Sequence, residues 1–176
     1  MKGSLKDQLL QMGFPDTTKM ATKKQKIKPK LLPIQDSSFD RGKILSMPFD
    51  ESDGIVVKGG YQEHRKHFVV LGVSENDSII GAFFINSIVN TNVKKTHKQL
   101  SGQFPLKQKD YPTILEYDSK LDCSDLIEVD KIKILSIGNE IGQLTTCDMD
   151  MVFLHIEESE LISAKQKKRF GFEDKS

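Results

Sequence analysis

A polar, basic stretch, His64-Arg65-Lys66-His67, directly precedes the apolar run FVVLGV. Arg65 carries a planar, permanently charged guanidinium that pairs with phosphate oxygens, and the histidines titrate near neutrality. On an extended strand side chains alternate, so Arg65 and His67 share one face. Phosphodiester cleavage without a metal needs such groups, a base for the attacking hydroxyl and a cation for the phosphorane. A structural role stays open, with His67 as a hydrogen-bonded strand residue and Arg65 in a surface ion pair.

Other chemical motifs are absent from the sequence. The two glycines of the loop before this strand, Gly59 and Gly60, lack the spacing of a phosphate-binding loop, and no G-x-S-x-G elbow exists. The aspartates between 118 and 130 lack the glycine and the terminal glutamate of an EF-hand. Cys123 and Cys147 form no C-x-x-C pair. The sequence therefore predicts no metal and no cofactor.

Charge divides the 176-residue chain into two parts. Residues 1–43 hold ten basic and four acidic side chains, a net charge of +6, which leaves −5 for the remaining 133 residues because the whole chain is +1. Residues 1–40 are predicted to be a basic arm, with a short amphipathic helix over 3–13 and a lysine-rich linker that includes Lys23 and Lys24. Such an arm binds nucleic acid or an acidic partner, or is only a solvated linker.

The apolar content suits a folded domain without a membrane span. Hydrophobic residues make up 37% of the chain and charged residues 29%. The longest apolar stretch is about half of the roughly 20 residues that cross a bilayer. The N-terminus is too polar for a secretory signal. We expect a cytoplasmic protein that does not enter a membrane.

From residue 41 the pattern changes to short runs rich in Ile, Val and Phe, separated by turn residues. Ser74 to Asp77 is predicted to join two of these runs in a hairpin. Thr145 or Thr146 can cap a helix over 147–157, and a basic stretch follows it. These elements predict a mainly β fold, a barrel or sandwich with a helical finish. The predicted strands are Lys43–Met47, Lys66–Val73, Ile79–Asn86, Ile114–Tyr117, Asp122–Val129 and Ile132–Ile137.

Four segments, in this order, resemble the MazF/PemK-like toxin endoribonucleases. They are RGKILSMPF, HRKHFVVLGV, GAFFINSIVN and LDCSDLIEVDKIKIL. The resemblance covers about residues 41–157. It implies a domain over 41–160 that is a small SH3-like β-barrel with short helices, between the arm and a basic C-terminal tail at 161–176.

The resemblance also implies a function. The chain would be a metal-independent endoribonuclease that cleaves single-stranded RNA and is held in check by an acidic antitoxin, and the family is usually dimeric. Arg65 would face Ser87 or Asn86 across the RNA groove, with His67 beside Arg65 on the strand. In the loop that precedes this strand, Lys58, Tyr61 and Gln62 would contact RNA.

Two departures keep an alternative open. The second basic residue that the family places after its L-C-D-Q-V run is absent, since Leu126 or Ile127 stands there, and the segment 94–106 is longer and more polar than the family loop. The alternative is a non-catalytic barrel that binds a protein or RNA partner through its arm. A phage or plasmid accessory or defence-related protein is a third possibility.

Overall fold

The computed structural model describes residues 30–55, 61–87 and 102–172. The helix predicted over 3–13 and most of the arm lie outside these residues. So do three of the predicted RNA contacts, Lys23, Lys24 and Lys58.

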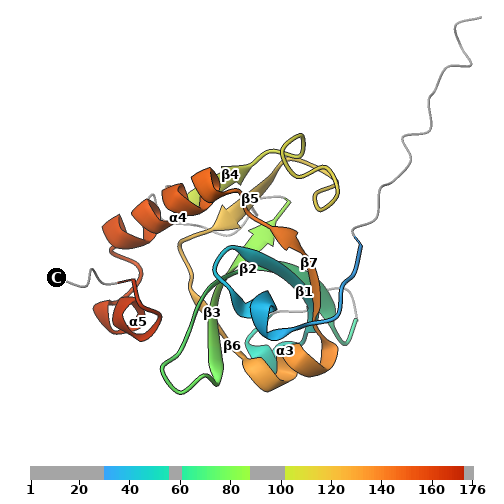
Figure 1. Cartoon of the computed structure of the whole chain (residues 1–176), viewed down its shortest axis with the longest axis horizontal. Helices are drawn as coiled ribbons and strands as arrows, with labels where there is room; N and C mark the ends of the chain where they lie inside the picture. The colour runs from blue at the N-terminus through green and yellow to red at the C-terminus, as the bar shows by residue number, and fades with distance from the viewer. Residues whose placement is uncertain (1–29, 56–60, 88–101, 173–176) are drawn as a thin grey trace, which may run out of the picture.

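In the described residues, seven antiparallel strands form one sheet (Figure 1). Their order is β4-β5-β3-β2-β1-β7, and β6 pairs with β3 beside β5. The mainly β class is confirmed. A closed barrel is not, because β4 and β7, at the two ends of the described strand path, do not pair with each other. The strands are β1 Lys43–Phe49, β2 His64–Val73, β3 Ile79–Asn86, β4 Gln103–Leu106, β5 Ser119–Asp122, β6 Ile127–Asp130 and β7 Asn139–Gln143.

The predicted hairpin between β2 and β3 is the centre of this sheet. Asp77 adopts a positive φ of 53° in the turn, and Ser74 accepts a hydrogen bond from the Ile79 amide at 3.0 Å. Because side chains alternate along β2, Val69 and Leu71 point into one core while Phe68 and Val70 point into another. The hairpin therefore separates two apolar layers.

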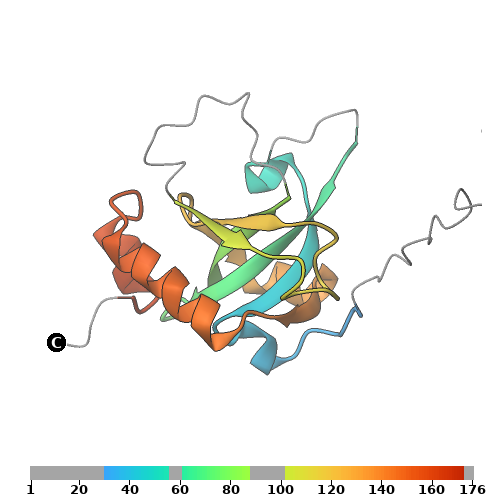
Figure 2. The same ribbon diagram turned by 90° about the horizontal axis from the view of Figure 1, so that it is seen from above.

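Helices cover both faces of the sheet (Figure 2). On one face α4 packs Val152 and Ile156 against the core that contains Val69, and on the other α3 packs Ile134 against the core that contains Phe68. Thr145 caps α4 by accepting a hydrogen bond from the Asp148 amide at 3.1 Å. No helix in the described ranges has the length and apolar character needed to cross a bilayer. The helices are α3 Lys131–Ile137, α4 Thr146–Glu158 and α5 Ala164–Arg169, with 3-10 turns η2 Asp36–Phe39 and η3 Glu51–Asp53.

Two of the predicted strands are wrong, and a third is interrupted. Ile132–Ile137 is helix α3, because the Asp130 carboxylate caps it by accepting hydrogen bonds from two backbone amides of its first turn. Ile114–Tyr117 is a turn, in which the Leu115 amide donates to the Tyr111 carbonyl at 2.9 Å. Asp122–Val129 is broken into the end of β5 and most of β6. The short edge strands β4 and β7 were not predicted.

The basic stretch after α4 joins the core. It forms α5, and beyond it Phe170 is 1% exposed against the hairpin. A Cβ atom at Gly81 would lie 2.9 Å from the Phe170 ring, and one at Gly72 would lie 2.7 Å from the Phe170 carbonyl oxygen. Arg41 donates hydrogen bonds to the carbonyls of Phe170 and Gly171 at 2.9 and 3.0 Å. Residues 161–172 therefore pack on the same body as the sheet.

Candidate functional site

An open cleft of about 510 Å³ lies where β2 begins and β3 ends. The third wall is the segment that leads into β5. This cleft collects residues more than 50 positions apart in sequence, since β2 begins at His64 and β5 at Ser119. Its lining residues are His64, Arg65, Lys66, His67, Ile85, Asn86, Ser87, Ile114, Leu115, Glu116, Tyr117 and Ser119.

Arg65 and His67 lie in the cleft on the same face of β2, as their spacing predicts. Arg65 pairs with Pro48 of β1, and His67 pairs with Ser46. The Arg65 guanidinium donates a long hydrogen bond, 3.5 Å from Nη1, to the hydroxyl oxygen of Ser46. Ser46 is 1% exposed. A buried hydroxyl thus lies below the exposed arginine and beside the histidine.

The environment of His67 favours its neutral form. Burial disfavours the imidazolium, and the positive charge of Arg65 adds to this, so the pKa of His67 is lowered from its ordinary value of 6.5. At pH 7 the imidazole therefore has a lone pair available to accept a proton. This is the protonation state that a general base requires.

Asn86 and Ser87 also line the cleft, from the end of β3. Ile85 pairs with His67, and alternation places Asn86 on the other face of the sheet. There its side-chain oxygen accepts a hydrogen bond from Lys66 Nζ at 3.4 Å. Burial lowers the pKa of Lys66. Ser87, one residue further, is exposed and is the better placed of the two to join Arg65.

The remaining predicted contacts are not brought together with this group. Tyr61 and Gln62 are exposed and precede β2 by a few residues, but neither belongs to the lining of the cleft.

Four residues that line or support the cleft were not predicted from the sequence: Ser46, Glu116, Tyr117 and Ser119. The apolar run before Tyr117 indicated a strand, whereas the chain turns there and carries Glu116 and Tyr117 to the cleft. The signal that could have identified Ser46 is a serine inside the otherwise apolar run of β1, whereas the polar sequence of β5 gives no such signal for Ser119. Both serines are buried.

No protein-family model matches the chain, and no curated protein matches it.

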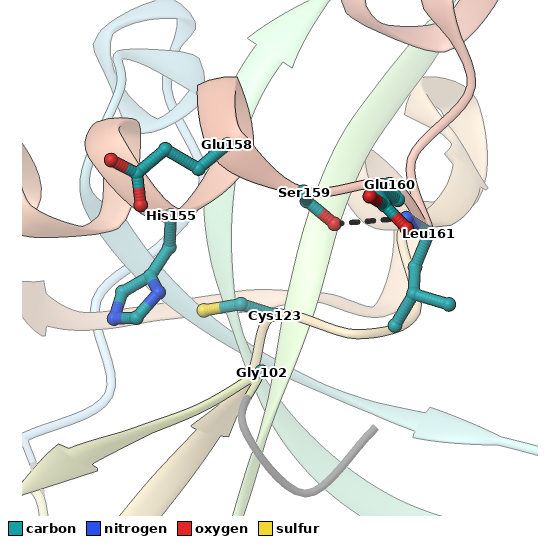
Figure 3. A pocket seen from close by; sticks show the side chains of 7 residues that line it. All are labelled: Gly102, Cys123, His155, Glu158, Ser159, Glu160 and Leu161. Carbon is teal, nitrogen blue, oxygen red and sulfur yellow. Dashed lines mark hydrogen bonds between the residues drawn. The ribbon is translucent and has the colours of Figure 1, made fainter. Parts of the chain in front are cut away.

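A second pocket, of about 340 Å³, lies between the end of α4 and the β4–β5 edge (Figure 3). His155 and Cys123 point into it, and carboxylates at 158 and 160 contribute to its wall. Burial raises the pKa of the Cys123 thiol to about 12. At neutral pH this cysteine is therefore a thiol and a weak nucleophile.

Metal ligands do not gather in the described part of the chain, where no group of three or more His, Cys, Asp or Glu side chains could hold an ion.

Proposed function

We propose that this chain is a metal-independent endoribonuclease whose site is the cleft at the start of β2. The observation that supports it best is the pairing of a neutral imidazole, His67, with a permanent cation, Arg65, on one face of one strand. One group can accept a proton and the other can stabilise negative charge. These are two of the three requirements for cleaving RNA through its own 2′-hydroxyl, and the third is a proton for the leaving 5′-oxygen.

In the proposed reaction, His67 removes the proton of the 2′-hydroxyl as that oxygen attacks the adjacent phosphorus. A bond from the 2′-oxygen to phosphorus forms and the bond to the 5′-oxygen breaks. The leaving oxygen takes a proton from water in the open cleft, and the hydroxide that remains takes back the proton that His67 removed. The products are a 2′,3′-cyclic phosphate and a 5′-hydroxyl.

Arg65 and Ser87 bind the phosphate in this scheme. The guanidinium offers paired N–H donors to the non-bridging oxygens, whose negative charge grows in the phosphorane. Ser87, the residue after the end of β3, adds a hydroxyl donor. The hydrogen bond to buried Ser46 limits the directions in which the Arg65 side chain can point. The substrate is single-stranded RNA, and an acidic antitoxin and a second copy of the chain are the proposed protein partners in the cytoplasm.

The decisive experiment is cleavage of a mixed-sequence RNA by the purified full chain in EDTA. We expect cleavage, with cyclic phosphate ends, and a loss of about a hundredfold or more in Arg65→Ala. Arg169→Ala is the matched control, because Arg169 pairs with Glu128 at 2.6 Å and does not line the cleft. Absence of cleavage, or equal cleavage by Arg65→Ala, would refute the proposal.

One observation favours a second function, a non-catalytic binding module. Where the resemblance leads one to expect a second cation, Leu126 is buried in the core and Ile127 begins β6. Neither side chain carries a charge that could pair with a phosphate. In this case the basic arm recruits RNA or an acidic protein.

Deleting residues 1–29 separates the two functions. The deletion should stop there, because the Leu32 amide pairs with the Glu140 carbonyl at 2.9 Å and Ser38 donates to the Glu140 carboxylate at 2.5 Å. A nuclease keeps cutting without the arm. An arm-dependent binder loses its ligand, and its RNA binding in the full chain falls steeply with salt.

A further inference from the structure

The side chain of Tyr117 is the largest exposed ring among the residues that line the cleft. It is 62% exposed. Within the described residues its ring stacks on no other aromatic side chain and its hydroxyl makes no hydrogen bond. Tyr117 belongs to the wall contributed by 114–119, whereas Arg65 and His67 belong to the wall contributed by β2.

The backbone of Tyr117, in contrast, is held from several sides. Its carbonyl accepts a hydrogen bond from the hydroxyl of Ser119 at 3.0 Å, and Ser119 is itself buried. The next carboxylate, Asp118, accepts from the Gln108 amide at 2.9 Å and from Lys107 Nζ at 3.2 Å. These contacts fix the point from which the ring projects.

The segment before Tyr117 is anchored as well. Ile114 and Leu115 are buried, and both of their amides donate to the Tyr111 carbonyl. The Tyr111 hydroxyl donates to Asp148 of α4 and accepts a hydrogen bond from the Thr145 amide at 3.1 Å. An exposed aromatic ring on an anchored backbone loses little conformational freedom on binding, because only its own rotations must be restricted.

We infer that Tyr117 is the platform on which the cleft stacks an unpaired nucleobase while Arg65 holds the neighbouring phosphate. The inference rests on the proposed function for the phosphate at Arg65. A volume of about 510 Å³ lies within the roughly 300–1,000 Å³ of small-ligand pockets and suits one nucleotide better than a duplex. Bases that have left their stack bind proteins by stacking on aromatic rings. The cleft therefore selects single-stranded segments by shape.

The test uses the full chain and a short single-stranded 2′-O-methyl oligouridylate that carries one 2-aminopurine. This strand cannot be cut through its 2′-oxygen, so binding is measured apart from catalysis. We expect binding to quench the 2-aminopurine fluorescence. Tyr117→Ala should bind between about fivefold and a hundredfold more weakly without that quenching. Tyr117→Phe keeps the ring and should behave like the wild type.

Two controls make the result specific. A backbone of the same length in which every position is abasic should bind wild type and Tyr117→Ala equally, because it offers no base to stack. Circular dichroism should show the same unfolding midpoint for both proteins, since the ring is mostly exposed. Equal quenching and affinity for Tyr117→Ala, or equal binding of a duplex, would overturn the inference.

The outcomes also separate this inference from the proposed nuclease. Quenching by a protein that fails to cut unmodified RNA supports the platform and refutes the nuclease. Normal cutting with no effect of Tyr117→Ala on binding or quenching refutes the platform and keeps the nuclease. No binding by the wild type refutes the platform.

Discussion

The cleft at the start of β2 and the pocket beside α4 each place a histidine on the wall of an open hollow, but the neighbours of the two histidines differ. Among the described residues, the lining of the cleft around His67 includes two basic side chains, Arg65 and Lys66, against one carboxylate, Glu116, whereas the pocket around His155 is lined by a buried thiol, two glutamates and no lysine or arginine. The basic excess attracts a phosphate group to the cleft, and the carboxylates repel it from the second pocket. The charge of the groups around each histidine, more than the histidine itself, therefore determines which of the two sites can bind RNA.

Replacing each histidine in turn tests this comparison most directly. We expect His67→Ala to slow RNA cleavage by about a hundredfold to ten-thousandfold, the usual range for a lost general base. His155→Ala should leave cleavage unchanged, because its ring packs edge-on against Phe104 at 5.9 Å outside the cleft. Single-turnover rates measure both. Equal losses of cleavage rate in the two variants would contradict the assignment of RNA cleavage to the cleft alone.

The next largest expected effect is on the alkylation of Cys123, the cysteine of the second pocket. A pKa of about 12, against the ordinary value of 9.0, lowers the thiolate population of Cys123 about a thousandfold at neutral pH. Burial slows access further. Iodoacetamide at pH 7.5 should therefore label exposed Cys147 first, and Cys147→Ser should show almost no labelling in native buffer, by mass spectrometry. Rapid labelling of Cys123 would show that the second pocket activates its thiol.

Replacing Ser87 tests how much its hydroxyl contributes to phosphate binding in the cleft. A hydrogen bond from a hydroxyl to a charged phosphate oxygen contributes about 1.5–3 kcal/mol, so Ser87→Ala should slow cleavage about tenfold to a hundredfold. Ser136→Ala is the matched control, an exposed serine on α3 whose hydroxyl donates to the Lys133 carbonyl at 2.8 Å. Initial rates at saturating RNA would measure the difference. An unchanged rate in Ser87→Ala would exclude this serine from phosphate binding.

The smallest expected effect is on stability. The folded chain holds the pKa of His67 below 6.5, so the unfolded chain binds the proton first as the pH falls. The contribution of neutral His67 to the free energy of unfolding is present above pH 6.5. It declines as the pH falls toward the folded pKa of His67 and does not decline further below that pKa. Urea unfolding from pH 7.5 to 5 should show a shallower decline for His67→Gln than for the wild type. Identical slopes would mean that His67 is not shielded in the folded state.

Much of the fold could be predicted because its central elements carry local signals. The β2–β3 hairpin has turn residues between two apolar runs, and Thr145 caps α4 in sequence as in structure. The short edge strands could not be predicted. β7 has one apolar residue, Ile141, and β4 contains Pro105, which strands accept mainly at edges. Pairing with neighbouring strands, which local pattern does not reveal, defines both of them.

From the residue pattern alone the candidate site was predictable only along β2, because Asn86 and Ser87 were expected in the site only from the family resemblance. Alternation placed Arg65 and His67 together, and that needs no tertiary information. The wall that carries Tyr117 depends on the bond from Tyr111 to Asp148, 37 residues away. Helix α3 was missed for a related reason, since alternating Lys and Ile in its first residues imitate a strand until the cap at Asp130 is recognised.

The pairing of β1 with β7 has a consequence for the folding kinetics. It joins Lys43 to Gln143, 100 positions along the chain, whereas β2 and β3 are joined by a short turn. Contacts between distant segments require closing a long loop before any stabilisation is gained, which slows folding. We expect the hairpin to form early and the β1–β7 ladder late. The strand that carries Arg65 and the strand that leads to Ser87 would then be paired before the edge of the sheet is in place.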